Sequence, residues 1–484
     1  MRRRRHRIAS AAAALAGTAT LVAGCSTMVD GAPVSVFADP FKVAGMQAVD
    51  GPTGLRPDAK EPNRDIENSN GGKVDQIAGA SVSDIEEYWQ TAYGDTFPGE
   101  FKPVSELISW DADDYDGTFC EDDTYGLVNA AFCPLDNTIG WDRGVLMPQL
   151  RQANGDMAIT MVLAHEYGHS VQKQAKLAKR GTPTLVGEQQ ADCFAGAYMR
   201  WVAEDNSPRF TLSTGDGLNN LLAGMISFRD PLLSEDDIYQ EGTGDEHGSA
   251  FERISAFQFG FTDGPSACAA IDAKEVAQRR GDLPVALQQD DTGEWPVSEE
   301  SVRAIVDAMN IMFTPQNPPA LTLNGIGTCA DARPSSPVSY CPATNTIAVD
   351  LPALEKLGTP SNDEDGTSMV SGDNTAYSVL MSRYMLALQH QQGGLVLDNA
   401  EAGLRTACLT GVATTKLSAG VSTPDGNTVA LTAGDLDEAV AGLLTNGLAA
   451  GDVNGESVPA GFSRIDAFRI GVLGDVDRCL KRFP

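Results

Sequence analysis

The chain repeats itself, and this feature constrains its fold more than any other. The segment FCPLDNTIGWD at residues 132–142 recurs as YCPATNTIAVD at 340–350, and FERISAF at 251–257 recurs as FSRIDAF at 462–468. A third match lies between them in the same order, with Val162, Leu163 and Gln172 recurring as Val379, Leu380 and Gln389. Matches in one order and at similar offsets indicate two copies of one folding unit.

The repeat and the composition around it divide the chain into parts. One copy spans residues 81–270 and the other spans 297–484, and a segment at 271–296 links them. Each copy has the size of an ordinary domain. We therefore expect an α+β protein built from two homologous domains.

The N-terminus indicates export and lipid anchoring. Residues 1–7 (MRRRRHR) are strongly basic, and 8–24 form an apolar run too short for a comfortable membrane span. The run ends in Val-Ala-Gly before Cys25, which resembles a bacterial lipobox. We expect a signal peptide at 1–24, lipidation of Cys25 and a flexible tether at 25–80. An ordinary signal peptide with an incidental cysteine and an uncleaved anchor are the alternatives.

The other cysteines follow the repeat, with four at matching places in each copy. An even, duplicated set in an oxidising compartment indicates disulfides, although four cysteines allow three pairings per copy. Because the first two bracket one short loop, we favour the pairs Cys120–Cys133, Cys193–Cys268, Cys329–Cys341 and Cys408–Cys479. Cysteine-bound metal is the alternative, but no CxxC spacing supports it.

The charge balance argues against some classes of binding partner. The chain has a formal net charge of −31 at pH 7. Such an acidic chain is not expected to bind nucleic acid or to adhere electrostatically to anionic lipid. We therefore expect the lipid on Cys25 to hold the protein at the extracytoplasmic face of the cell membrane.

The pattern HExxH, written here as HEYGH, occurs within a predicted helix at 157–179. Positions four apart share a helix face, so the imidazoles of His165 and His169 can bind one metal ion. Glu166 lies beside them, where it can take a proton from a metal-bound water. Gly168 costs ~1 kcal/mol inside a helix, which a close approach of another backbone or of substrate would explain. A chance HExxH on an amphipathic helix is the alternative.

A catalytic zinc site needs a third protein ligand and one position for water. Glu188 follows the second histidine by 19 residues, in the segment EQQADCFAGAY, which we predict to be a second helix. Asp192 lies on the same face of that helix and can orient a ligand histidine through its ring N–H. We expect one Zn²⁺ per chain, held by His165, His169 and Glu188.

These motifs resemble those of a known bacterial family. HEYGHSVQ, then EQQADCFAGAY, preceded by FCPLDNTIGWD and followed by HGSAFERISAFQFGF, are similar to the putative neutral zinc metallopeptidase family and, more closely, to mycobacterial lipoprotein peptidases. The resemblance covers most of residues 115–270. It implies a gluzincin-like site, with Glu166 as general base beside the three ligands, in zincin-like domains that combine a small sheet with helices.

The resemblance also implies peptide-bond hydrolysis through a zinc-activated water. Zinc polarises the scissile carbonyl, and Glu166 moves the proton of the water to the leaving amine. The developing oxyanion needs a donor, for which His247 and Tyr198 are the candidates. A strand is predicted nearby, and the resemblance makes it the edge strand that pairs with extended substrate: Thr138, Ile139, Gly140 and Trp141.

The second copy lacks the site residues of the first. At the repeat offsets, Ser382, Arg383 and Leu386 replace His165, Glu166 and His169, while Gly403, Ala407 and Val458 replace Glu188, Asp192 and His247. None of the replacements is a zinc ligand. We expect 297–484 to be a degenerate, non-catalytic repeat, in which His390 is an ordinary histidine.

The sequence thus predicts a membrane-anchored zinc metallopeptidase whose chemistry resides in the first copy and whose partner is a peptide or protein substrate. A binding or scaffold lipoprotein with a purely structural zinc is the alternative. Glu166 favours the enzyme, because a structural site has no use for a general base beside its ligands.

Overall fold

The computed structural model describes most of the chain, in the ranges 26–29, 32–35, 39–114, 117–179, 181–227, 229–232, 247–287, 292–361 and 369–484. The predicted signal peptide and Cys25 lie outside the described residues. Within the described ranges, no helix combines the length and the apolarity needed to cross a bilayer.

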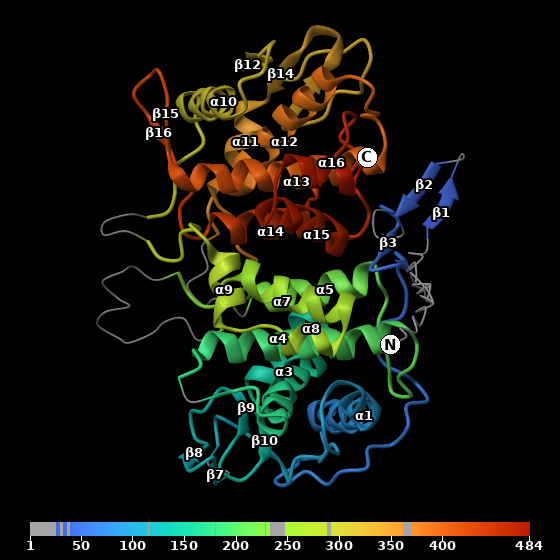
Figure 1. Ribbon diagram of the computed structural model, residues 1–484. Helices are drawn as coiled ribbons and strands as arrows, with labels where there is room; N and C mark the ends of the chain where they lie inside the picture. The colour runs from blue at the N-terminus through green and yellow to red at the C-terminus, as the bar shows by residue number, and fades with distance from the viewer. Residues whose placement is uncertain are drawn as a thin grey trace, which may run out of the picture.

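The first half combines a three-stranded sheet with a stack of helices (Figure 1). The central strand β10 (Thr138–Asp142) pairs parallel with β6 (Leu107–Trp110) and antiparallel with β9 (Ala130–Cys133). The helices around it are α1 (Lys73–Thr96), α2 (Leu146–Asn154), α3 (Asp156–Ala175), α4 (Thr184–Ala203), α5 (Asp216–Ser227), α7 (Ala250–Asp263) and α8 (Pro265–Ala269).

The second half repeats this order of elements. Its central strand β14 (Thr346–Val349) pairs parallel with β12 (Ala320–Thr322) and antiparallel with β13 (Val338–Cys341). The helices are α10 (Glu299–Phe313), α11 (Leu351–Leu357), α12 (Asp373–Gln392), α13 (Ala400–Lys416), α14 (Asp435–Thr445), α15 (Gly461–Val472) and α16 (Val476–Arg482). The repeat in the sequence is therefore a repeat of topology, down to the strand directions in the sheet.

The closest helix packing is also duplicated. Helix α4 meets α7 at Gly196 and Gly260, and a Cβ on these residues would lie 2.1 Å from the Phe257 carbonyl oxygen and 1.8 Å from the Cys193 carbonyl oxygen. Helix α13 meets α15 in the same way at Gly411 and Gly471, where the corresponding distances are 2.2 and 1.8 Å. Only glycine allows two helix backbones to approach so closely.

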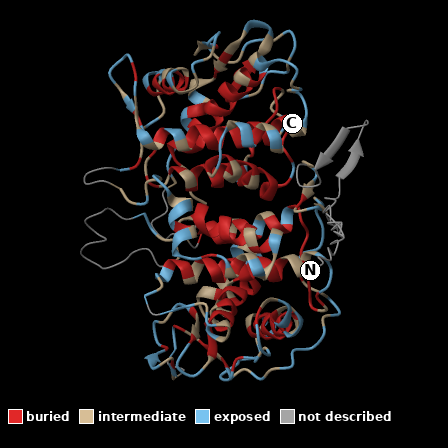
Figure 2. Cartoon of the chain, viewed as in Figure 1, coloured by how far each residue is buried: buried red, intermediate tan, exposed pale blue. Residues whose placement is uncertain are grey.

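The two halves meet through four helices. In Figure 1, α5 and α7 of the first half face α14 and α15 of the second, and these helices are in contact. The buried rings of Phe261 and Phe462 pack across this boundary with centroids 5.0 Å apart. Buried residues continue on both sides of it (Figure 2), so one hydrophobic core runs through both halves.

Four disulfides join the pairs favoured from the sequence. Two tie the loop before the antiparallel outer strand to that strand, β9 in the first half and β13 in the second. The other two tie α4 to α8 and α13 to α16. Among the described cysteines, each half is thus cross-linked in the same way and only to itself.

The prediction of a flexible tether at 25–80 was wrong for its described later part. Residues 73–80 already belong to α1, and β5 (Gly54–Leu55) pairs with β11 (Phe210–Thr211). Val43 is fully buried, and the Lys42 carbonyl oxygen accepts a hydrogen bond from Ser463 of the second half. A few apolar residues are enough to hold a polar segment in place when their side chains are buried against a larger core, as that of Val43 is. The predicted linker at 271–296 similarly contains a helix, α9 (Ala273–Arg280).

A cluster of carboxyl groups, half-buried at Glu294 and buried at its neighbours, joins the linker to the second half. Oxygens of Glu294, Asp373 and Glu438 lie within 4.8 Å of one another, and Asp435 adds a fourth acid. Burial, together with the charge of Glu294, raises the pKa of Asp373 to about 7. Burial and all three neighbours raise the pKa of Glu438 to about 10. The cluster is therefore most stable when protonated.

This cluster predicts a stability that declines with rising pH. Asp373 keeps its proton in the folded chain up to about pH 7 but loses it near pH 4 when unfolded, so the free energy of unfolding should fall between these values by up to about 1.4 kcal/mol per pH unit. Asp373→Asn should flatten that decline, whereas Asp398→Asn, at an exposed position, should not. Urea unfolding of the three proteins from pH 4.5 to 7.5, with EDTA present, checks this. Parallel pH profiles for all three would contradict it.

Candidate metal centre

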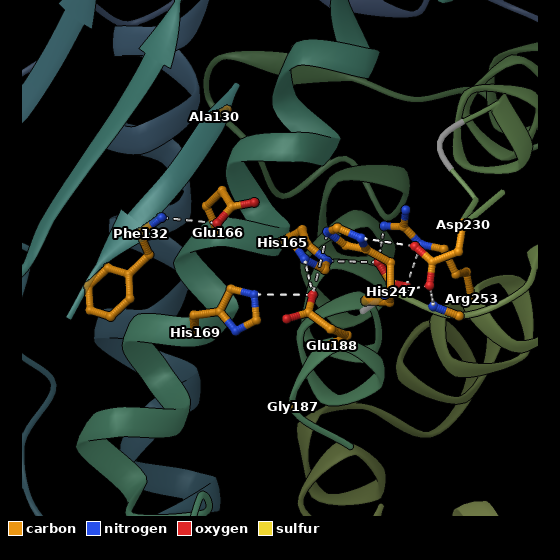
Figure 3. A network of polar contacts seen from close by, with 12 residues as sticks. Ala130, Phe132, His165, Glu166, His169, Gly187, Glu188, Asp230, His247 and Arg253 are labelled. Atoms are coloured by element: carbon orange, nitrogen blue, oxygen red, sulfur yellow. Dashed lines mark hydrogen bonds and ion pairs between the residues drawn. The ribbon is translucent and has the colours of Figure 1, made fainter. Parts of the chain in front are cut away.

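Helices α3 and α4 carry the residues of the predicted site, and they lie against each other at Gly168. A Cβ at Gly168 would lie 2.9 Å from the Cα of Ala191 on α4, which explains the glycine in the HEYGH motif. The close approach brings the HExxH face of α3 against the part of α4 that carries Glu188 (Figure 3). Asp192 lies one helical turn further along α4.

The imidazoles of α3 converge on one carboxylate oxygen. Glu188 Oε2 lies 3.0 Å from His165 Nε2 and 3.4 Å from His169 Nε2. In a tetrahedral zinc site with bonds of about 2.0–2.1 Å, neighbouring ligand atoms lie about 3.3 Å apart. Both nitrogen–oxygen separations thus match the distance between two corners of a zinc tetrahedron, and the donor set of two imidazoles and one carboxylate fits a zinc ion.

Asp192 binds the ring of His165 on the side opposite Glu188. Its Oδ1 lies 2.8 Å from His165 Nδ1, and both of its oxygens accept hydrogen bonds of 2.9 Å from the guanidinium of Arg253 on α7. Burial opposes ionisation of Asp192, but Arg253 and His165 outweigh it and lower its pKa to about 2. Burial likewise lowers the pKa of His165, but the carboxylates of Asp192 and Glu188 raise it to about 10. The hydrogen bond between Nδ1 and Asp192 fixes the ring with Nε2 towards Glu188.

Replacing Asp192 by asparagine should weaken zinc binding by about 10–100-fold, because the charge that orients and polarises His165 is lost. The amide keeps an oxygen for His165, so the fold should survive. Competition with a chromophoric chelator measures the affinity, and Glu204→Gln, at the exposed end of the same helix, is the matched control. Equal zinc affinity in both variants would show that Asp192 does not support the site.

Glu166 is held at the sheet side of the centre. Its Oε2 accepts a hydrogen bond of 3.0 Å from the backbone N–H of Phe132 on β9. The side chain also lines a cavity of about 250 Å³, together with His165, His247 and Arg253. The rest of that lining is mostly apolar and comes from β9 with the loop before it, α2, α3 and α5: Val128, Asn129, Ala130, Leu146, Leu150, Ala158, Met161, Val162, Leu221, Gly224 and Met225.

His247 reaches the centre from the segment before α7. Its Nε2 is 3.9 Å from Glu188 Oε2, and its side chain is 43% exposed. Ligand atoms of His165, Glu188 and His247 lie within 4.8 Å of one another, so His247 is a further candidate ligand of the same centre. Asp230 fixes it, through hydrogen bonds to the His247 backbone N–H (2.9 Å) and to Nδ1 (3.2 Å). His247 therefore lies beside the predicted metal ligands, with Nε2 on the side of Glu188.

Two predictions about the surroundings of the site were wrong. Tyr198 cannot act as an oxyanion donor, because it is fully buried and donates its hydroxyl to Asp84 at 2.7 Å. The strand at Thr138–Trp141 is not an edge, because β6 and β9 occupy both of its sides. The edge beside the centre is β9, whose backbone holds Glu166.

The second half brings the corresponding positions together but without metal ligands. A Cβ on Gly403 would lie 3.1 Å from Val458 Cγ2, so the counterparts of Glu188 and His247 are again neighbours. Arg383 takes the place of Glu166, and its Nε donates to the Val338 carbonyl oxygen on β13, the counterpart of β9. Burial lowers the pKa of Arg383 to about 10.

Curated proteins from two bacteria are similar to part of this chain. The uncharacterized protein Rv2575 of Mycobacterium tuberculosis is 29% identical over 202 residues, which cover 37% of this chain and 66% of that protein. The uncharacterized protein YpfJ of Escherichia coli K12 is 31% identical over 164 residues, which cover 29% of this chain and 54% of that protein. The chain thus spans less than two thirds of the length of these curated relatives, and no solved structure matches it.

The family model of putative neutral zinc metallopeptidases matches residues 4–271, more than half of the chain. This range contains the HExxH helix, Glu188, Asp192 and His247. As its motifs predicted, the chain belongs to the putative neutral zinc metallopeptidase family.

Proposed function

We propose that this protein is a membrane-anchored, extracytoplasmic peptidase that hydrolyses peptide bonds at one zinc ion in its first half. One observation carries the proposal. The Nε2 atoms of His165 and His169 meet a single Glu188 oxygen at 3.0 and 3.4 Å, and Glu166 lies next to them on a cavity wall. Anchoring rests on the lipobox-like segment before Cys25.

The roles of the residues follow from their positions. Zinc on the three ligands would polarise the substrate carbonyl and lower the pKa of a water molecule. Glu166, held by the Phe132 N–H, accepts the proton of the attacking water and delivers it to the leaving nitrogen. With both ring nitrogens protonated, His247 donates from Nδ1 to Asp230 and from Nε2 to the carbonyl oxygen as negative charge develops there.

The metal test uses the mature chain from residue 26, assayed on a broad peptide library. Chelation should abolish hydrolysis, and one equivalent of Zn²⁺ per chain should restore it. The same stoichiometric zinc binding without hydrolysis of any peptide would overturn the peptidase proposal and support the scaffold lipoprotein instead.

The lining of the cavity suggests the substrate class. Extended substrate can pair with the edge of β9 and place a side chain into the cavity formed by residues such as Leu150, Met161 and Met225. Burying a leucine or phenylalanine side chain there should raise kcat/KM by about 10–100-fold over an aspartate or lysine. A set of peptides that differ only beside the scissile bond checks this. Equal rates across the set would contradict the assignment of the cavity as a specificity pocket.

The second half, on this proposal, is a degenerate copy of the zincin-like unit without catalytic function. Its support is the repeated topology together with the replacement of the metal ligands by Ser382, Leu386 and Gly403. In a variant whose Glu166 is replaced, the second half should therefore contribute no metal-dependent hydrolysis.

A further inference from the structure

The second half reaches into the first at the start of α7. Asp437 on α14 is 7% exposed, and its carboxylate accepts hydrogen bonds from the backbone N–H groups of Ala250 (3.1 Å) and Phe251 (2.9 Å). These are the first two amides of α7, which have no partner inside the helix. The helix's own cap, Ser249, serves a different amide, that of Glu252.

The segment whose amides Asp437 binds carries two residues that reach the metal centre, Arg253 and His247. Arg253 lies two residues after Phe251 and forms the double hydrogen bond to Asp192, which orients His165. His247 lies three residues before Ala250. A shift of the start of α7 would therefore displace a metal-ligand support and the proposed oxyanion donor together.

The reciprocal contact exists on the other side of the boundary. Asn219 on α5 of the first half accepts a hydrogen bond of 3.0 Å from the backbone N–H of Gly461, the first residue of α15. Helix α5 corresponds to α14, and α15 corresponds to α7, so Asn219 is the counterpart of Asp437. However, α15 leads to Arg464, which donates to backbone carbonyl oxygens rather than to a metal-site carboxylate.

We propose that the second half is a built-in positioning partner of the catalytic half, and that Asp437 is the positioning residue which keeps α7, and with it Arg253 and His247, in place. This inference rests on the proposed peptidase function. Loss of the carboxylate leaves two buried amides unpaired at that helix end. Loss of Asn219 leaves one amide, that of Gly461, unpaired at the start of a helix that carries no residue of the metal centre.

The experiment compares Asp437→Ala with its counterpart Asn219→Ala in the full mature chain. We measure kcat and KM, the visible absorption spectrum of the cobalt-substituted protein, and the thermal midpoint. Both variants should lose some stability. Only Asp437→Ala should lower kcat, by about tenfold with KM changed less than twofold, and alter the cobalt spectrum. The conservative Asp437→Asn, which keeps one acceptor oxygen, should recover most of kcat.

The outcomes separate this inference from the proposed function. If Asp437→Ala retains kcat and the cobalt spectrum of the unaltered protein, or if Asn219→Ala loses as much of both, the positioning role is wrong. If Asp437→Ala does not fold, Asp437→Asn decides by the same comparison. If the unaltered protein hydrolyses no peptide, the peptidase proposal fails, and the cobalt spectra of the two variants still test whether Asp437 supports the metal centre.

Discussion

Replacing Glu166 by glutamine should lower kcat for peptide hydrolysis by about 10²–10⁴-fold while zinc remains bound. The amide cannot accept a proton from the attacking water, yet its oxygen can still accept the hydrogen bond from the Phe132 N–H that positions the side chain. The metal ligands are untouched, so KM should change little. Steady-state kinetics beside metal analysis of the same samples measures both effects.

Glu106→Gln is the control for this change. Glu106 is an exposed glutamate directly before β6, in the sheet whose strand β9 holds Glu166. Its replacement should leave kcat unaltered. Unchanged activity in Glu166→Gln would remove the general base from the mechanism. Loss of zinc in that variant would instead place Glu166 among the groups that hold the metal.

Gly260→Ala should destabilise the fold by about 3 kcal/mol, because the added methyl group cannot fit. Its carbon would lie 1.8 Å from the Cys193 carbonyl oxygen and 2.9 Å from the Ala197 nitrogen, both backbone atoms of α4. The two helices would have to separate. Denaturant unfolding followed by circular dichroism measures the loss of free energy of unfolding.

Gly94→Ala is the matched control, since Gly94 also lies in a helix but has nothing within 4 Å of the added carbon. It should stabilise the protein by about 0.5–1 kcal/mol, because alanine is the better helix former. A Gly260→Ala protein as stable as the Gly94→Ala protein would mean that the α4–α7 crossing is wider than described.

The parts of the site that depend on helix spacing could be predicted from the sequence. Residues four apart on a helix face the same way whatever surrounds them, so the placement of His165 and His169 on one face of the helix predicted at 157–179 agrees with α3. The expectation that Gly168 allows a close backbone was confirmed at Ala191.

Whether a strand lies at the edge or in the centre of its sheet could not be predicted in this way. The pattern TIGWD suits an edge and a central strand alike, and the parallel partner β6 comes from a segment some thirty residues earlier that carries no turn signal linking the two. Pairing of this kind is decided by tertiary packing.

Arg253 and Asp230 were missed for different reasons. Arg253 recurs in the second copy as Arg464, so it looked like a framework residue of the repeat. Its counterpart survives without a carboxylate because the Leu443 and Val458 carbonyl oxygens accept its hydrogen bonds. Asp230 lies in no recognisable motif, and its role appears only when the fold brings it beside His247.

The cross-links described above have a consequence for how the duplicated chain is held together. Because all four disulfides among the described residues close within one half, the packing of one half on the other depends on non-covalent contacts, as it does between the subunits of a dimer. A covalent connection keeps such partners at an effective concentration on the order of millimolar. Docking at this fixed one-to-one stoichiometry does not depend on expression level or dilution, so each half keeps its neighbour at any concentration of the protein.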